Sequence, residues 1–357
     1  MHDLLVVAGE ASGDALAAEV LDDLRAPSFG LGGRRLAGAG AELVADVGSF
    51  SAMGVTAVLP RVSRLALALG ALAVAVRRRR PAAALLVGFS EANARVADWL
   101  KRRGTRTLWY APPQVWAWRP ERAPSIAKNC ERLAVLLPFE APHWARSGAR
   151  VDYVGHPAAS RVSAAPARRA VALLPGSRSH EVRAHLPPLL AASRRLMESG
   201  FDAELVLAEG LDARTTSWAE RRARESGVRV VRRGVTEIAG AAAAVVASGT
   251  ATLECAALGV PPVIVYRTDP LTFAVAARLV RVDHVGLPNL VLGERAFPEL
   301  LQREVTPRAI AGALSEVLRD GERYRALCGK VRGALRDSLD DRRPSERVAA
   351  MLRPWLD

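Results

Sequence analysis

The sequence predicts an α/β protein with two domains, each built around a doubly wound parallel sheet. Short apolar runs alternate with helix-like segments in both halves, which is typical of parallel strands joined by helices. The chain has 357 residues, half of them apolar, enough for two domains of somewhat more than about 150 residues each. A stretch without periodicity at 155–169, rich in Pro, Ala and Ser, separates the halves as a hinge linker.

In the first half, apolar runs indicate strands and amphipathic segments indicate helices. Strands are expected at Leu4–Ala8, Ala83–Val87, Thr107–Tyr110, Leu133–Leu136 and Val151–Val154, and helices at Asp14–Arg25, Val62–Arg79 and Ala92–Arg102. The segment "GLGG" at 30–33 begins like a dinucleotide fingerprint, but Arg35 stands where the third glycine should be. We therefore interpret it as a tight turn beside a packed helix and expect no NAD.

The second half repeats the pattern. Strands are expected at Ala170–Leu174, Glu204–Leu207, Val228–Val231, Ala243–Ala247 and Pro262–Val265, and helices near Glu181–Ser199, Arg214–Ser226, Ala251–Leu258 and Leu271–Val280. After Thr306 the chain is helical and polar, with a break at Arg343–Pro344. The predicted domains are residues 1–160 and 161–335, with a helix in 336–357 packing back on the first. Because ligands bind at the carboxyl ends of parallel strands, a ligand site is expected there.

The charge and the cysteine content of the chain limit which partners and which cellular compartment are expected. The net charge of +13 comes from arginines spread along the chain, and no nucleic-acid-binding motif accompanies them, so no nucleic-acid partner is expected. The charge favours a membrane surface or an anionic small molecule, or else reflects a bias in composition. Three cysteines without C-x-x-C spacing indicate neither a zinc site nor a disulfide framework, which fits the cytoplasm.

One apolar segment indicates contact with a membrane surface. The stretch Leu65–Val76 would span only about 18 Å as a helix, too short to cross a bilayer. Four arginines follow it, so residues 61–80 are typical of an interfacial helix that meets anionic headgroups. A core helix with a solvated basic end fits the same residues.

A first candidate phosphate site follows the strand that ends at Ala247. Ser248, Gly249 and Thr250 precede a helix, and a helix N-terminus with hydroxyls and unhindered N–H groups suits a diphosphate. A plain helix cap uses the same residues. Glu254 lies one turn later on the same face, where its carboxylate can accept both hydroxyls of a ribose. The chain has no Walker lysine and no Asp-x-Asp sequence, so no metal ion is expected.

A second candidate site is the turn in "LLPGSR" at 173–178. Gly176 lets the backbone approach a ligand, Ser177 offers a hydroxyl, and Arg178 brings a permanent forked charge to the carboxyl end of a strand. An ordinary strand-to-helix turn with a surface arginine is the alternative. The position of this turn, at the end of the first strand of the second domain, favours the ligand site.

The first domain has a comparable turn in "AGEASGD" at 8–14. Glu10 and Asp14, with Ser12 between them, are placed to orient acceptor hydroxyls, or Ser12 and Asp14 cap the following helix.

In "PPQVWAWRPER" at 112–122, Trp116 and Trp118 either line an acyl pocket or lie in the core.

With these motifs in view, the chain resembles the lipid-A-disaccharide synthase family. The matching segments are "AGEASGD", "MGV" with "VLPR" (53–61), "VWAWR", "LPFE" (137–140), "VGHP" (154–157), "LLPGSR", "ASGTATLE", "PNL" with its following glycine (288–293) and "PELLQ" (298–302). Each is weak alone. Their occurrence in family order from residue 8 to 302 makes chance similarity improbable.

The resemblance implies a GT-B fold, a site without metal or cofactor, and a cytoplasmic enzyme peripheral to the inner membrane. It implies transfer of diacylglucosamine from UDP-diacylglucosamine to diacylglucosamine 1-phosphate, with inversion because UDP donors are α-linked and the product is β-linked. The implied nucleotide-side residues are Ser177, Arg178, Ser248, Gly249, Thr250, Glu254 and Asn289, and further substrate-binding residues are Ser12, Met53 and Gln302.

One segment departs from the family pattern. Where the family usually has an Asp-Ala-Pro-Asp-Phe-like sequence whose first aspartate is the favoured base, this chain reads "GFSEANARVADWL". Ser90 and Asn93 stand at the two aspartate positions, and neither accepts a proton near neutral pH. Candidate bases are therefore Glu91, Glu10 and Asp14. The alternative is a paralogue that keeps the UDP site but uses another acceptor or none.

Overall fold

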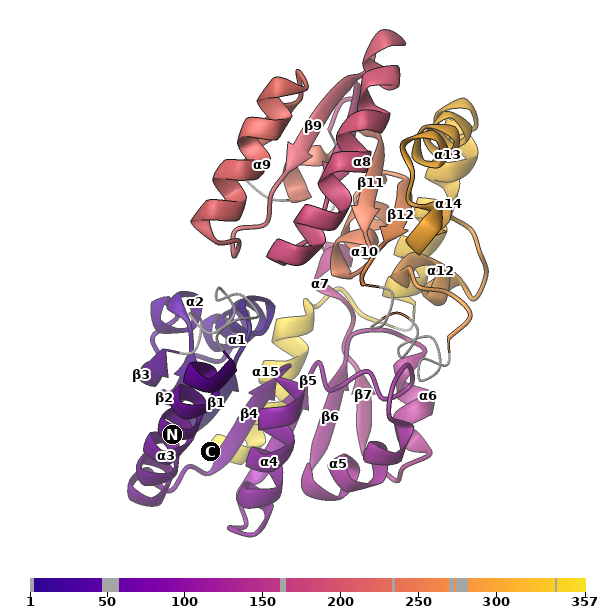
Figure 1. Ribbon diagram of the computed structural model, residues 1–357. Helices are drawn as coiled ribbons and strands as arrows, with labels where there is room; N and C mark the ends of the chain where they lie inside the picture. Colours follow the sequence, from indigo (N-terminus) through magenta and orange to yellow (C-terminus); the bar gives the residue numbers. More distant parts are fainter. Residues whose placement is uncertain are drawn as a thin grey trace. The chain divides into compact units, whose positions relative to one another are not determined.

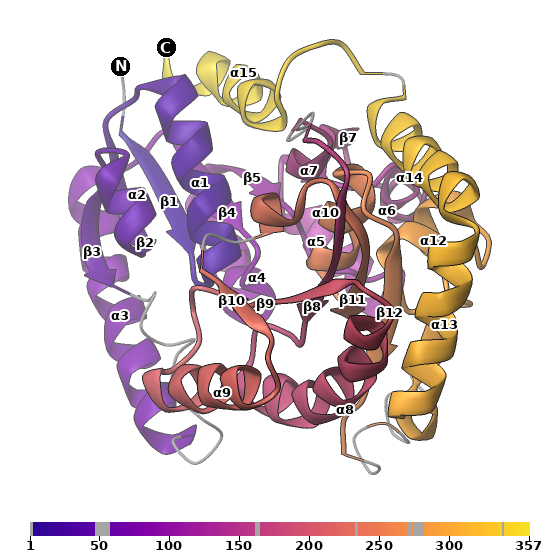
Figure 2. The ribbon, with the colours of Figure 1, turned by 90° about the horizontal axis from the view of Figure 1, so that it is seen from above.

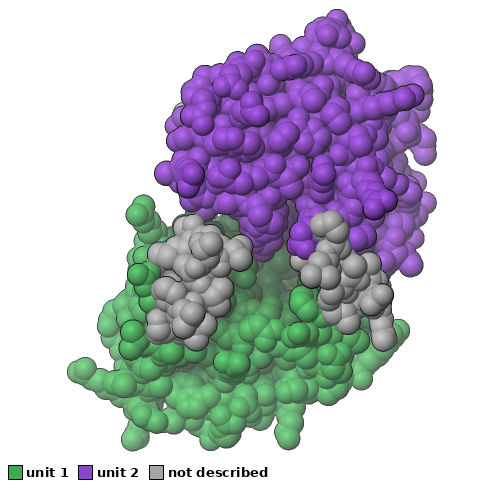
Figure 3. All heavy atoms as spheres, in the orientation of Figure 1, with its two compact units in different colours: residues 1–156, 339–357 green, residues 157–338 purple. Residues whose placement is uncertain are grey.

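The structure is a computed structural model that describes residues 3–46, 58–160, 165–232, 235–269, 273, 282–337 and 339–357 (Figure 1). The chain divides into two compact units (Figure 3). Unit 1 comprises residues 1–156 and 339–357, and unit 2 comprises residues 157–338. In each unit, the strands pair in parallel and helices flank the sheet. The predicted class, two doubly wound parallel sheets, is confirmed.

Unit 1 contains a seven-stranded sheet in the order β3-β2-β1-β4-β5-β6-β7. Its elements are β1 (Leu4–Ala8), α1 (Ala11–Leu24), β2 (Ser28–Gly32), α2 (Arg34–Gly38), β3 (Glu42–Asp46), α3 (Val58–Arg79), β4 (Ala83–Val87), α4 (Ser90–Lys101), β5 (Arg106–Tyr110), η2 (Pro120–Arg122), α5 (Ala123–Asn129), β6 (Arg132–Val135), α6 (Glu140–Ala145), β7 (Val151–Tyr153) and α15 (Pro344–Leu356). Both faces of the sheet are covered, which explains why its central strands are continuous apolar runs.

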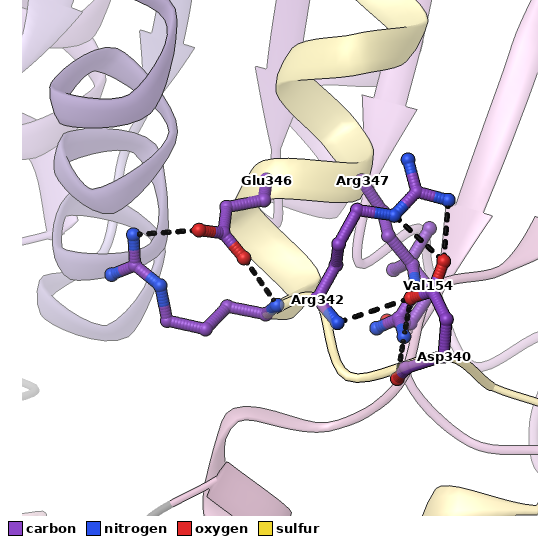
Figure 4. Close-up of polar contacts among 6 residues, drawn as sticks. Val154, Asp340, Arg342, Glu346 and Arg347 are labelled. Atoms are coloured by element: carbon purple, nitrogen blue, oxygen red, sulfur yellow. Dashed lines mark hydrogen bonds and ion pairs between the residues drawn. The ribbon is translucent and has the colours of Figure 1, made fainter.

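The chain returns to unit 1 after unit 2. Helix α15 lies beside α1 (Figure 1), and its apolar residues, among them Val348 and Leu352, complete the core on that face of the sheet. The Arg347 guanidinium donates to the Val154 carbonyl oxygen over 3.1 Å and to the Asp340 carboxylate (Figure 4). The two ends of unit 1 that lead into unit 2 are therefore joined by one side chain.

Unit 2 contains a six-stranded sheet in the order β10-β9-β8-β11-β12-β13. Its elements are α7 (Pro157–Ser160), β8 (Arg168–Leu174), α8 (Ser179–Glu198), β9 (Asp202–Val206), α9 (Ala213–Glu225), β10 (Arg229–Val231), η3 (Val235–Ile238), β11 (Ala241–Ala247), α10 (Thr250–Ala257), β12 (Pro262–Tyr266), α12 (Leu287–Leu292), β13 (Glu299–Leu301), η4 (Gln302–Glu304), α13 (Pro307–Arg319) and α14 (Gly321–Arg336). Helix α8 packs between α9 and α13 (Figure 2), and α10 packs against α14.

All ten predicted strands are present, within a few residues of their expected ends. Strands β2, β3 and β13 were not predicted, because they are short and carry glycines or charged residues. The interpretation of 30–33 as a tight turn is wrong for Gly30 and Gly32, which lie in β2, whereas Gly33 does precede α2. Gly30 has φ of 155° and approaches β1 so closely that a Cβ would lie 1.8 Å from the Val6 carbonyl oxygen. Of the helix expected at 271–280, only residue 273 is described.

Candidate active site

Each sheet has one point where the strand order reverses, between β1 and β4 in unit 1 and between β8 and β11 in unit 2. The connections on the two sides of such a point run over opposite faces, and ligands of open parallel sheets bind beyond the carboxyl ends of the two strands. The predicted site residues gather there: Glu10, Ser12, Asp14 and Glu91 follow β1 and β4, and Ser177, Arg178, Ser248, Gly249 and Thr250 follow β8 and β11. The geometry of each unit therefore agrees with a ligand site.

The turn after β8 is occupied by a carboxylate of the protein itself. Glu181 Oε2 accepts the backbone N–H groups of Ser177 at 3.0 Å and Arg178 at 3.2 Å, and Oε1 lies 3.0 Å from the Arg178 guanidinium. Gly176 has φ of 127°, and a Cβ there would lie 2.6 Å from the Glu181 side chain. Glu181 thus caps α8, while the Arg178 side chain remains 68% exposed with donors left for a ligand.

The turn after β11 is open by comparison. Ser248 donates its hydroxyl to the Val285 carbonyl oxygen over 2.9 Å, and Gly249, with φ of 149°, precedes α10. Within the part of the chain that the structure describes, the backbone N–H groups of Thr250 and Ala251 donate to no acceptor. Such N–H groups at the positive end of a helix are suited to an anion. Glu254 lies one turn further on α10 and is half-buried.

The carboxyl end of β12 is held by two side chains. The Arg267 N–H donates to His185 Nε2 over 2.9 Å, and the Thr268 N–H donates to Gln302 Oε1 over 3.0 Å. Gln302 adopts a left-handed conformation with φ of 50°. The predicted site residue Gln302 therefore supports the backbone beside the site through its amide oxygen.

Asn289 is completely buried, and its amide is used within the protein. Its nitrogen donates to the Phe297 carbonyl oxygen at 2.9 Å and to Glu299 at 2.8 Å, and its oxygen accepts the Phe297 N–H at 2.8 Å. Glu299 also accepts the N–H groups of Val285 and Gly286. Asn289, which was predicted to bind the substrate, therefore fixes α12 and the segment that receives the Ser248 hydroxyl.

In unit 1, Asp14 caps a helix other than its own. Its carboxylate accepts the N–H groups of Gly33 at 2.6 Å, Arg35 at 3.0 Å and Leu36 at 3.3 Å, at the start of α2. The side chain is buried. The Asp14 oxygens, proposed for a base, are therefore committed to these donors, and the side chain is shielded from solvent.

Glu10 and Ser12 lie at the start of α1 and are exposed. Among the described residues, Glu10 makes no hydrogen bond or ion pair with its side chain. Glu91 is also exposed, in the first turn of α4, but the Arg122 guanidinium donates to both of its oxygens at 2.6 and 3.3 Å. Ser90 begins α4, so the chain has already left β4 at Glu91. Glu91 could replace the usual base only if it did not lie on the strand, and this condition is met.

Asn93, which stands where the resemblance leads us to expect the second aspartate, has a structural role. Asn93 is fully buried, and its amide nitrogen lies within hydrogen-bonding distance of the carbonyl oxygens of Val7, Val87 and Gly88. These oxygens mark the ends of β1 and β4. Asn93 therefore ties together the two strands at which the order of the sheet reverses.

The motifs "VWAWR" and "LPFE" meet in unit 1. Glu140 is buried and accepts the Trp116 indole N–H at 3.0 Å and the Leu137 N–H at 2.9 Å, while the Trp116 ring packs edge-on against Phe139. Burial raises the pKa of Glu140 above its ordinary value, and the bonds from Trp116, Leu137 and Leu136 oppose the shift. Neither motif was expected from the residues alone to position the other, since they lie 24 residues apart.

Three further observations concern metals, membranes and one predicted residue. No group of three His, Cys, Asp or Glu side chains arranged to hold a metal ion occurs among the described residues. In the same residues, no helix has the length and apolarity needed to span a membrane. Met53, a predicted substrate-binding residue, lies outside the described residues.

Solved structures with low sequence identity share this fold. The glycosyltransferase of kitacinnamycin aligns with a TM-score of 0.62 at 16% identity, covering 100% of this chain and 99% of that chain. A calicheamicin glycosyltransferase aligns with a TM-score of 0.63 at 14% identity, covering 100% and 98%. The two parallel-sheet units and this likeness define a protein of the glycosyltransferase fold known as GT-B.

Sequence comparison identifies the family. Residues 4–343 match the profile described as Lipid-A-disaccharide synthetase. The Lipid-A-disaccharide synthase of Anaeromyxobacter dehalogenans strain 2CP-C is 38% identical over 373 residues, covering 98% of this chain and 97% of that protein. That of Myxococcus xanthus strain DK1622 is 38% identical over 377 residues, covering 98% of both. The chain belongs to the lipid-A-disaccharide synthase family.

Proposed function

We propose that the protein transfers 2,3-diacylglucosamine from UDP to the 6-hydroxyl of 2,3-diacylglucosamine 1-phosphate. The products are the lipid A disaccharide 1-phosphate and UDP, and the acceptor proton passes to a base. The observation that carries this proposal is the open N-terminus of α10 on the strand adjacent to the Arg178 turn. Leu174 of β8 and Val246 of β11 are paired, so the two turns begin side by side.

On the donor side, the diphosphate would lie against the N–H groups of Thr250 and Ala251, which donate to no acceptor in the described part of the chain. Arg178 would supply the positive charge, because its side chain is exposed and, among the described residues, pairs with Glu181 alone. Both groups favour the transition state, since negative charge grows on UDP as the sugar leaves. Glu254 would accept the ribose hydroxyls one turn along α10.

On the acceptor side, we assign the base to Glu10. A single displacement with inversion needs a proton acceptor beside the attacking hydroxyl. Among the described residues, the Glu10 carboxylate is unpaired, whereas Glu91 would first have to leave Arg122. Both follow the switch point of unit 1, so Glu91 is kept as the second candidate.

The replacement of both family aspartates by Ser90 and Asn93 favours a second candidate function. A paralogue would bind UDP-sugar at unit 2 and use another acceptor or none. The deciding measurement is UDP release from UDP-diacylglucosamine with and without diacylglucosamine 1-phosphate. Release that depends on this acceptor, with a disaccharide product, supports the synthase. UDP binding without acceptor-dependent release indicates the paralogue.

We further propose that unit 1 docks on the cytoplasmic face of an anionic membrane through α3. Leu67 is 74% exposed and Val74 is 64% exposed, one heptad apart on this helix. Arg77 and Arg78 are exposed at its end. An exposed apolar stripe that ends in arginines suits the interface between headgroups and acyl chains, where the lipid substrates would be drawn from.

A further inference from the structure

His185 lies on α8 with no exposed surface, and both of its ring nitrogens are engaged. Nδ1 lies 2.8 Å from the Pro175 carbonyl oxygen, and Nε2 lies 2.9 Å from the Arg267 backbone nitrogen. Pro175 begins the turn that carries Arg178, and Arg267 follows the last residue of β12. One buried ring therefore bridges two segments that are distant in the sequence, since Arg267 lies 82 residues from His185.

These contacts allow only one form of the ring. A backbone N–H is always a donor, so Nε2 must be unprotonated to accept from Arg267. Nδ1 then carries the proton and donates to the Pro175 carbonyl oxygen. A second proton on Nε2 would face the Arg267 N–H, so protonation breaks this bond.

The electrostatic surroundings agree with this geometry. The pKa of His185 is lowered below its ordinary value, chiefly because burial disfavours the charged ring. The Pro175 bond and the Glu181 charge oppose the shift, while Arg267 and His180 add to it. The ring is therefore neutral at neutral pH.

The two bridged segments flank the proposed diphosphate site. Strand β11, whose turn is Ser248–Thr250, lies between β8 and β12. Glu181, one turn before His185 on α8, holds the other end of the same turn through the Ser177 and Arg178 N–H groups. Helix α8 thus fixes the Arg178 turn at both ends, and His185 extends this support to β12.

Resting on the proposed donor site, we propose that His185 is a positioning residue for nucleotide binding. Its neutral ring keeps the Arg178 turn in place relative to the Arg267–Thr268 segment. Protonation at Nε2 releases Arg267 and weakens the binding of UDP. Because the folded ring resists protonation relative to the unfolded chain, folding stability is also lost as the pH falls below about 6.5.

The test compares UDP affinity by calorimetry between pH 8 and pH 5 in three proteins: the wild type, His185→Gln and His180→Gln. Glutamine at 185 offers an amide oxygen to the Arg267 N–H and cannot be protonated. His180 is the matched control, since it lies on the same helix and is exposed. UDP's own phosphate titrates near pH 6, so the result is read as the ratio between proteins.

We expect the affinity of the wild type and of His180→Gln to fall in acid by about tenfold more than that of His185→Gln. The same fall in all three proteins would overturn the proposal. Absence of UDP binding by the wild type at pH 8 would instead contradict the donor site itself. Thermal unfolding at pH 8 shows whether His185→Gln is folded.

A second measurement keeps the proposal testable if His185→Gln does not fold. Nitrogen-15 NMR of the wild type reports which ring nitrogen carries the proton. A proton on Nδ1 at pH 8, followed by faster exchange of the Arg267 amide as the ring titrates, is the expected result. A proton on Nε2, or an Arg267 amide that does not respond to the ring, would contradict the proposal.

Discussion

The side-chain amide of Asn93 lies 3.3 Å from the Val7 carbonyl oxygen, joining α4 to the end of β1. The same nitrogen lies 3.4 Å from the Val87 carbonyl oxygen and 2.9 Å from that of Gly88. An amide can donate to these oxygens and a carboxylate cannot. The side-chain nitrogen of Asn93 therefore suits these carbonyl oxygens, whereas an aspartate would face them with acceptor oxygens alone.

The first prediction concerns this site. Asn93→Asp should destabilise the protein by about 3 kcal/mol at pH 7, because it buries an uncompensated charge against carbonyl oxygens. The pKa of the introduced carboxyl would be raised, so the loss should shrink as the pH falls toward 4. Urea denaturation at pH 7 and pH 5 measures both effects. Asn129→Asp, at the half-buried end of α5, is the control and should cost much less.

The second prediction tests the donor charge. Arg178→Ala should weaken UDP binding and slow transfer by roughly a hundredfold, the effect of losing a preorganised donor at developing charge. Arg194→Ala removes the same charge from an exposed position near the other end of α8 and should change neither. Calorimetry with UDP and a transfer assay give the two readouts. Equal UDP affinity in both variants would refute the assignment of Arg178.

The third prediction separates the two candidate bases. Glu10→Gln should reduce transfer by about a hundredfold or more while UDP affinity is unchanged, because the amide keeps the shape but cannot take the proton. Glu91→Gln should leave transfer within a few fold, since Glu91 is already paired with Arg122. The opposite outcome would move the base to Glu91. If the wild type shows no acceptor-dependent transfer, Ser90→Asp tests whether the family residue restores some.

The fourth prediction addresses the α3 surface. The protein should sediment with anionic liposomes at low salt and be released at high salt, because its arginines are screened. Replacing Leu67 and Val74 together by Gln should abolish sedimentation without lowering thermal stability, since both side chains are exposed. Sedimentation of this double variant to the same extent as the wild type would exclude α3 as the docking surface.

The fifth prediction concerns the return of the chain to unit 1. Arg347→Ala should destabilise unit 1 by about 2 kcal/mol, because it removes a charged donor from the Val154 carbonyl oxygen. Arg342→Ala is the control. Arg342 contacts Asp340 at the surface, so its loss should have a smaller effect. Urea denaturation of each variant measures the difference, and equal losses would assign the effect to Asp340 rather than to the Val154 contact.

The central strands and the switch-point turns could be predicted because they depend on local patterns. A run such as Leu4–Ala8 is apolar throughout, and Gly9 comes directly after it, with Ser12 three residues later. The roles of Asp14 and Asn93 could not, since Asp14 caps a helix 19 or more residues away and Asn93 bonds to a strand 86 residues away. The same holds for His185, whose partner Arg267 is near only after β8 and β12 enter one sheet. A hydrogen-bond partner that comes near only in the folded protein leaves no periodic pattern in the sequence.

The position of α15 has a consequence for how the protein is made. Unit 2 is a continuous segment, so nothing in its connectivity prevents it from forming while the ribosome is still translating the C-terminal residues. Unit 1 has every strand of its sheet by residue 153, yet the apolar strip beside α1 stays uncovered until 344–356 have emerged. A gene fragment that stops at residue 156 would therefore encode a unit 1 with an exposed apolar surface. Unit 1 is best produced alone with residues 339–357 fused after residue 156.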